Sequence, residues 1–140
     1  MSTPKAEGFR FPAEWHPHRA TWLSWPHNTN SWPGKIASIY QPYCKFIREV
    51  AKGEEVCINI VNDKMQAKAM TYLKDSGADL TKIKFYQHPT NDAWCRDHGP
   101  AFVIKDGGKA IINWGYNAWG EKYPPYDLDN QIPTKVAEQL

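Results

Sequence analysis

The segment EEVCINIV, residues 54–61, constrains the fold more than any other part of the sequence. It is apolar at nearly every position, which is typical of a strand buried on both faces of an α/β sheet. Apolar residues with helical spacing precede it over residues 35–52, and a second helix is predicted from Asp63, as N-cap, to Gly77. Strand and helices therefore alternate around this segment.

The remaining elements follow from shorter patterns. Pro42 lies inside the first helical pattern, so we expect that helix either to kink there or to begin near Gln41. A last helix is predicted near the end of the sequence, with Asp129 or Asn130 as its cap. Strands are predicted over residues 20–26 and 82–88, and a hairpin over residues 101–114 with Asp106-Gly107-Gly108 as its turn.

This order predicts an α/β protein with mixed strand directions. The final helix has one apolar face that requires a sheet to cover, and no strand follows it. We therefore expect residues 1–140 to be the N-terminal portion of a longer chain.

Composition narrows the functional classes. The net charge is only +2, with 17 basic and 15 acidic residues, which gives no reason to expect a nucleic-acid partner. No apolar run approaches the length of a membrane span, and the first residues lack the apolar core of a secretory signal. The three cysteines have no paired spacing, which favours a reducing compartment over a disulfide framework. His16 and His18 lack further ligands at suitable spacing, so we expect no metal site.

The segment PTNDAWCRDHGPAF, residues 89–102, holds the strongest candidate site. Trp94 and Asp97 combine a flat aromatic face with a carboxylate, which suits a planar cation. The ring attracts such a cation by about 1–2 kcal/mol in a dry site, and the carboxylate accepts two parallel N–H bonds. Asp92 would hold a second donor or orient the loop. The alternative is a salt bridge from Asp97 to Arg96 or another arginine, with Trp94 in the core.

The residues alone do not decide the role of Cys95 or of the loop that begins at residue 114. Arg96 follows Cys95 directly, and a neighbouring cation lowers the pKa of a thiol, as a nucleophilic cysteine requires. A small buried thiol without a catalytic role is the favoured alternative. In the loop WGYNAWGEKYPPYDLDN, residues 114–130, Tyr116, Asn117 and Trp119 would line a pocket mouth. The alternative for that loop is a packed Ω-loop.

Three stretches, residues 11–35, 91–100 and 113–130, together resemble the N-terminal part of the agmatine deiminases. These enzymes belong to the bacterial-type peptidylarginine deiminase family, in the guanidino-group-modifying superfamily. The resemblance implies α/β modules around a pseudo-fivefold axis, a pentein-like propeller of mixed sheets with helices outside. It also implies hydrolysis of agmatine to N-carbamoylputrescine and ammonia, toward putrescine, with no metal or organic cofactor.

The resemblance assigns roles to two residues of this sequence. Trp94 matches the tryptophan that lies against the substrate guanidinium, and Asp97 matches the carboxylate that binds its nitrogens and supports catalysis electrostatically. The nucleophilic cysteine, the general-base histidine and a second acid would lie beyond residue 140. Cys95 occupies a variable position, so it is not assigned as the nucleophile. The 140 residues alone are expected to be inactive.

Rival functions remain at this point. The loop from Tyr116 to Gly120 has no arginine and only Lys122 nearby, which favours agmatine over arginine or a peptidyl-arginine. Trp119, Glu121 and Asp127 are candidates for holding the agmatine amine. A non-catalytic cation-binding module and an inactive relative are the other hypotheses. The resemblance further implies a cytoplasmic enzyme with a small-molecule guanidinium substrate and a homodimeric assembly.

Overall fold

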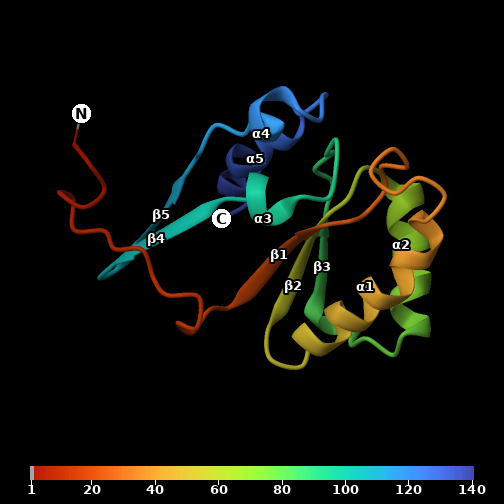
Figure 1. The fold of residues 1–140 in the computed structure, drawn as a ribbon. Helices are drawn as coiled ribbons and strands as arrows, with labels where there is room; N and C mark the ends of the chain where they lie inside the picture. The colour runs from red at the N-terminus through yellow and green to blue at the C-terminus, as the bar shows by residue number, and fades with distance from the viewer. Residues whose placement is uncertain (1) are drawn as a thin grey trace.

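The computed structural model describes residues 2–140 and has two sheets, one parallel and one antiparallel. The parallel sheet has three strands in the order β1-β2-β3, and the other sheet pairs β4 with β5 (Figure 1). The α/β class and the mixed strand directions are thereby confirmed. Within the described residues each sheet is of one kind, so the mixed sheets that the resemblance implies for the propeller are not seen in this part of it. The strands are β1 (Ala20–Ser24), β2 (Glu55–Asn59), β3 (Ile83–Tyr86), β4 (Ala101–Lys105) and β5 (Gly108–Ile112).

Helices connect the parallel strands. The chain runs β1-α1-β2-α2-β3 through neighbouring strands, and crossovers of one hand then place both helices on the same face of the sheet. Figure 1 shows α1 and α2 together on that face. The helices are α1 (Ile36–Val50), α2 (Asp63–Asp75), α3 (Cys95–His98), α4 (Ala118–Glu121) and α5 (Ile132–Glu138), with 3-10 turns η1 (Leu80–Lys82) and η2 (Asp129–Gln131).

The main core lies between this sheet and the two helices. Along β2, Val56 and Ile58 pack toward α1 and α2, where Ile47 and Leu73 are fully buried. Cys57 and Asn59 alternate to the opposite face and are buried as well. The prediction of a strand covered on both faces is confirmed.

Two details of the predicted helices are wrong. The start near Gln41 is wrong, because α1 begins at Ile36 and continues through Pro42. Burial of Tyr40 against the core outweighs the backbone hydrogen bond that proline removes. The N-cap of α2 is Asn62 rather than Asp63, since Asn62 is extended and its side chain accepts the Met65 N–H at 2.9 Å.

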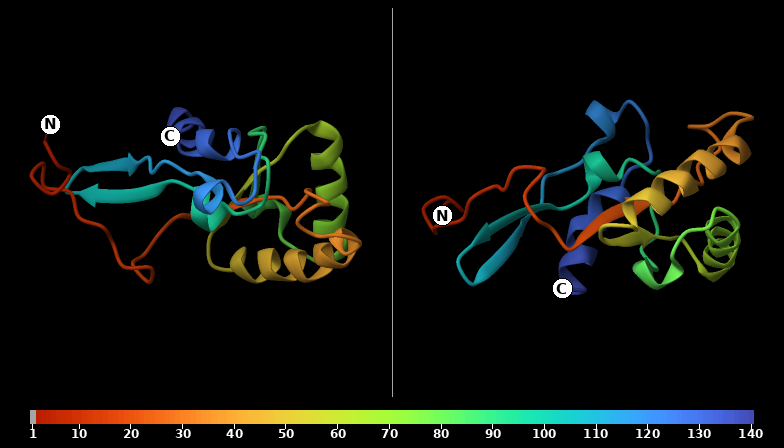
Figure 2. Two further views of the ribbon diagram at one scale, coloured as in Figure 1. Left: turned by 45° about the horizontal axis from the view of Figure 1, so that its top comes forward. Right: turned by 90° about the horizontal axis from the view of Figure 1, so that it is seen from below.

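The predicted hairpin is confirmed. Strands β4 and β5 pair from Ala101↔Ile112 to Lys105↔Gly108, so Gly108 belongs to the strand and the turn is Asp106-Gly107. Arg10 pairs with Ile104 on the outer edge of β4 through two backbone hydrogen bonds of 2.8 and 2.9 Å. Figure 2 shows the hairpin reaching away from the parallel sheet with the N-terminal segment beside it.

The last helix forms, but neither predicted residue caps it. The residue before α5 is Gln131, and no side chain caps the helix. The oxygens of Asp129 and Asn130 instead accept backbone N–H groups of two distant loops. Tertiary donors therefore outcompete the local cap at these positions.

Candidate functional site

The candidate motif folds as one helical turn between β3 and β4. The backbone N–H groups of Asp97 and His98 donate to the Trp94 carbonyl at 2.9 and 3.0 Å, which closes α3. An extended segment would have put Trp94 and Asp97 on opposite sides. In the helical turn, Cys95 and His98 point inward and are buried, whereas Trp94 and Asp97 are exposed.

Gly99 makes this tight turn possible. A Cβ on Gly99 would lie 2.3 Å from the Cys95 carbonyl oxygen, which is far inside contact distance. The Gly99 N–H donates to the same carbonyl at 2.8 Å. Only glycine therefore allows the chain to leave α3 so closely against it.

The loop before α3 is held by Asp92. The side chains of Ser31 and Asn28 both donate to Asp92 Oδ2, and the Ala93 N–H donates to Asp92 Oδ1 at 2.8 Å. The Asp92 carboxylate is buried. These contacts fit the sequence-based alternative in which Asp92 orients the loop.

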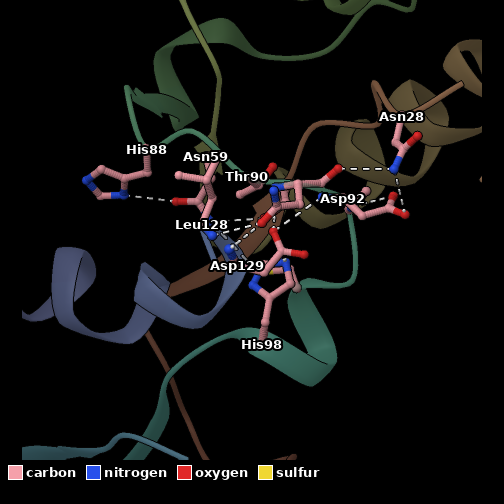
Figure 3. A network of polar contacts seen from close by, with 12 residues as sticks. Asn28, Asn59, His88, Thr90, Asp92, His98, Leu128 and Asp129 are labelled. Carbon is pink, nitrogen blue, oxygen red and sulfur yellow. Dashed lines mark hydrogen bonds and ion pairs between the residues drawn. The ribbon is translucent and has the colours of Figure 1, made fainter. Parts of the chain in front are cut away.

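A second attachment joins this loop to the segment before α5. Asp129 Oδ1 accepts the N–H groups of Asn91 and Asp92 at 2.7 and 3.2 Å. In return, Asn91 Oδ1 accepts the N–H groups of Leu128 and Asp129 at 2.8 and 3.2 Å. We call these four hydrogen bonds the Asn91–Asp129 clasp. Figure 3 shows Leu128 and Asp129 beside the loop, with His98 close below.

Cys95 belongs to a buried polar chain. Asn59 donates to Ser24 Oγ at 3.1 Å and lies 4.0 Å from Cys95 Sγ, and its amide oxygen meets His88 Nδ1 at 3.0 Å. Burial raises the pKa of the Cys95 thiol to about 12. A thiol with that pKa stays protonated at neutral pH, as a buried structural cysteine does. The cysteines Cys44, Cys57 and Cys95 are all free.

His98 and Asp129 form a buried pair that the sequence analysis did not single out. The atoms His98 Nε2 and Asp129 Oδ1 are 4.0 Å apart, and neither ring nitrogen of His98 has a hydrogen-bond partner within residues 2–140. Burial lowers the pKa of His98 to about 4 and raises the pKa of Asp129 to about 6. No local pattern marks this pair, because the two residues meet only in the folded chain.

The second aromatic loop contains a left-handed turn. Ala118, Trp119, Gly120 and Glu121 all have positive φ, between 50° and 78°. Such a turn costs roughly 1–2 kcal/mol for each residue that is not glycine. Asn117 supports it, since its side chain accepts the Gly120 N–H at 2.9 Å and its carbonyl accepts the Glu121 N–H at 2.7 Å.

This turn brings its indole against the first motif. The rings of Trp119 and Trp94 meet edge to face, with centroids 5.4 Å apart and planes at 86°. Tyr116 contacts Trp119 in the same way at 5.8 Å. The structure therefore joins two of the sequence-predicted segments, residues 89–102 and 114–130, into one aromatic cluster.

Two hollows flank the α3 turn. A hollow of about 460 Å³ is lined by Trp94, Asp92, Tyr116, Asp129 and Lys122, among others. A second, of about 560 Å³, is lined by Asp97, Trp22 and Trp114. Trp94 lines the first of these hollows and Asp97 the second, so neither of the two encloses a planar cation between both residues.

The alternative arrangement, a salt bridge from Asp97 to an arginine with Trp94 in the core, does not form in the described residues. Arg96 pairs with Glu14 at 2.7 Å, and Asp97 makes no ion pair within the described residues. Trp94 is 38% exposed, so it is not sealed in the core. The acid and the indole are both accessible to a ligand.

The two histidines considered as metal ligands have hydrogen-bond partners within the chain. His18 contacts Glu54 at 2.6 Å, and His16 contacts Arg10 and the Pro17 carbonyl. Over residues 2–140, no group of three or more His, Cys, Asp or Glu side chains is arranged to hold a metal ion. In the same residues, every helix is too short or too polar to cross a membrane.

The fold and this site define an α/β protein that presents an accessible acid and indole on a helical turn. The model of the Porphyromonas-type peptidyl-arginine deiminase family matches residues 10–140. The chain belongs to this family.

Comparison with relatives shows how much of the length of a family member this chain represents. It is 38% identical over 144 residues to a relative from Selenomonas ruminantium, covering 99% of this chain and 38% of the relative. It is 34% identical over 142 residues to agmatine deiminase of Pseudomonas aeruginosa, covering 98% of this chain and 37% of that enzyme. A substrate-bound agmatine deiminase of C. jejuni superposes with a TM-score of 0.78 at 25% identity, covering 94% of this chain and 37% of that one. The chain thus spans just over a third of the length of these relatives.

Proposed function

We propose that this chain supplies part of the guanidinium site of an enzyme that hydrolyses agmatine to N-carbamoylputrescine and ammonia. The observation that carries the proposal is the α3 turn, which exposes Asp97, without an ion-pair partner in the described residues, and Trp94 at its start. Family membership and the named relatives support the same chemistry. Putrescine synthesis would use the product.

In this proposal, Asp97 accepts two N–H bonds from the guanidinium and stabilises its positive charge, so that the central carbon stays electrophilic. Trp94 lies against the planar cation. A cysteine thiolate supplied by the rest of the complete protein attacks the carbon, ammonia leaves, and water then releases the ureido product. A histidine base from the same source activates that water.

The remaining parts of the proposal rest on the resemblance and on the contacts of the two loops. We propose that residues 1–140 form the N-terminal portion of one pseudo-fivefold propeller, whose other modules complete the wall opposite Asp97. Asp92 and Asn117 act in the site by holding their loops, and Trp119 by supporting Trp94. A cytoplasmic location and a homodimer stay predictions.

Arginine is the second candidate substrate, because Lys122 lines the same hollow as Trp94. A lysine there would suit a substrate carboxylate. The two acids suggested for the agmatine amine already have partners: Glu121 accepts the Tyr126 hydroxyl at 3.0 Å, and Asp127 lies 3.4 Å from the Asn91 amide. Ammonia release from agmatine, arginine and a peptidyl-arginine separates these candidates.

The decisive test uses Asp97→Asn and Trp94→Ala in the complete protein. Loss of a charged contact in a dry site costs roughly 3–5 kcal/mol, so we expect agmatine turnover to fall by at least about 100-fold. Asp75→Asn, at an exposed position on α2, is the matched control and should keep normal turnover. Near-normal turnover in Asp97→Asn would show that the assignment of Asp97 is wrong.

A further inference from the structure

The segment Leu128–Asn130 is attached to both loops that carry the aromatic cluster. Asp129 and Leu128 take part in the Asn91–Asp129 clasp, which joins residues 38 apart in sequence. The adjacent Asn130 accepts the Tyr116 N–H through Oδ1 at 2.8 Å. Consecutive residues therefore hold the loop before α3 and the loop before the left-handed turn.

This shared attachment determines how the two indoles meet. Trp94 follows Asn91 of the clasp by three residues, and Trp119 follows Tyr116 by three. Their edge-to-face contact at 5.4 Å requires both loops to keep a fixed separation. Within residues 2–140, neither loop lies in a sheet that would fix that separation through backbone pairing.

The chemistry of Asp129 fits a positioning role better than a stabilising one. The carboxylate is only 2% exposed and lies 4.0 Å from a buried imidazole nitrogen that has no hydrogen-bond partner in the described residues. A buried charge disfavours folding, and such residues concentrate at functional sites. The charge in turn strengthens the two hydrogen bonds from the loop.

We propose that Leu128–Asn130 is the positioning segment of the candidate site, with Asp129 fixing the Trp94–Asp97 turn and Asn130 fixing the loop that carries Trp119. Neither side chain touches the reacting atoms in this role. The effect of this segment on catalysis rests on the proposed function, whereas its effect on how firmly the two loops are held does not.

Amide hydrogen exchange of the complete protein without substrate directly measures how firmly the two loops are held. In Asp129→Ala, we expect the amides of Asn91 and Asp92 to exchange at least about tenfold faster, because their acceptor is lost. In Asn130→Ala, the Tyr116 amide should exchange faster while Asn91 and Asp92 stay protected. Asp129→Asn keeps an acceptor oxygen and should preserve protection, which also covers the case in which Asp129→Ala fails to fold.

A matched control separates this effect from the general loss of a carboxylate. Asp79 is exposed and accepts the Thr81 N–H at 3.0 Å, at the N-cap of η1, before β3, whereas the candidate motif follows that strand. Asp79→Ala should leave exchange over residues 91–98 and turnover unchanged. In Asp129→Ala, a misplacement of about 1 Å should lower kcat about 100-fold with a smaller change in KM, and Asp129→Asn should restore most of the loss.

The outcomes separate the two proposals. Unchanged exchange at Asn91 and Asp92 in Asp129→Ala, or loss of protection in Asp129→Asn, would overturn the positioning role whatever the substrate. Inactivity of the unmodified protein on every guanidinium compound would remove the proposed function and leave the exchange result to decide the positioning role. Normal kcat in a folded Asp129→Ala protein would overturn the inference for catalysis.

Discussion

The parallel-sheet region, residues 20–86, and the loop region, residues 87–140, are held together by different forces. The first packs apolar side chains between a sheet and two helices, with Ile47, Ile58 and Leu73 fully buried. The second has a two-stranded hairpin and several short turns joined by side chains that accept backbone N–H groups, and it also fully buries Ile132 and Val136 of α5. Hydrophobic burial tolerates small displacements, whereas hydrogen bonds fix distances and angles.

This difference suggests a division of work. The sheet region supplies stability, and the loop region supplies the geometry of the candidate site. Strain agrees with this view, since the residues other than glycine with positive φ all lie in the loop region, at Ala118, Trp119 and Glu121, among the described residues. Strained backbone of this kind persists where the surrounding structure enforces it, often at functional sites.

The largest expected effect contrasts one residue from each region. Ile47→Ala removes a fully buried side chain, so we expect the free energy of unfolding to fall by about 2–5 kcal/mol, with normal turnover per folded molecule. Asp97→Asn, at an exposed position, should change it by less than about 0.5 kcal/mol. Denaturant unfolding of the complete protein measures both. Similar destabilisation by the two changes would contradict the division of work.

A smaller effect concerns pH and the buried pair of the loop region. The pKa of Asp129 is about 6, above its ordinary 3.8, so its contribution to stability falls as pH rises from about 4 to 6. The pKa of His98 is about 4, below its ordinary 6.5, so its contribution falls as pH drops from 6.5 to 4. The two trends oppose each other and partly cancel in the unmodified protein.

Single substitutions should reveal each trend. In Asp129→Asn, stability should fall on acidification from pH 6.5 to 4, and in His98→Phe it should fall as pH rises from 4 to 6, each by on the order of 2 kcal/mol. Unfolding free energies measured across pH 4–7 provide the test. If both variants kept the pH dependence of the unmodified protein, the pair would not titrate as the burial of its members requires.

The smallest effect refines the sheet region itself. Asn62→Ala removes the N-cap of α2 and should cost about 1 kcal/mol of unfolding free energy. Asp63→Ala removes a favourable charge near the helix terminus and the exposed hydrogen bond that Gln87 donates to Asp63, and should cost about 0.5 kcal/mol. Thermal unfolding of the two variants ranks them. The reverse ranking would favour the cap that the sequence pattern suggested over the one observed.

Most of the sheet region was predictable because its pattern is local. The apolar run at residues 54–61 and the helical spacing before it identified β2 and α1. The hairpin of the loop region was just as local, since it followed from Asp106-Gly107-Gly108 between two apolar runs. The errors were confined to element ends, such as Asn62 at the start of α2. Ends depend on single hydrogen bonds, whereas periodic patterns average over many residues.

The candidate site was less predictable. Residue types alone placed Trp94 and Asp97 together, and the motif resemblance gave them roles. The sequence did not indicate that α3 is helical, that residues 118–121 turn left-handed, or that Asp129 leaves its helix end to hold Asn91. Each of these depends on partners that are distant along the chain.

The sequence by itself therefore determined the α/β class, the order of the main elements and the family of the chain. Apolar periodicity and contiguous motifs depend only on residues that are close together in the sequence. Only the tertiary structure decided which polar side chains act as local caps and which cross to another segment. The physical reason is that a buried N–H must find an acceptor, and the acceptor that folding brings nearest is often far away in sequence.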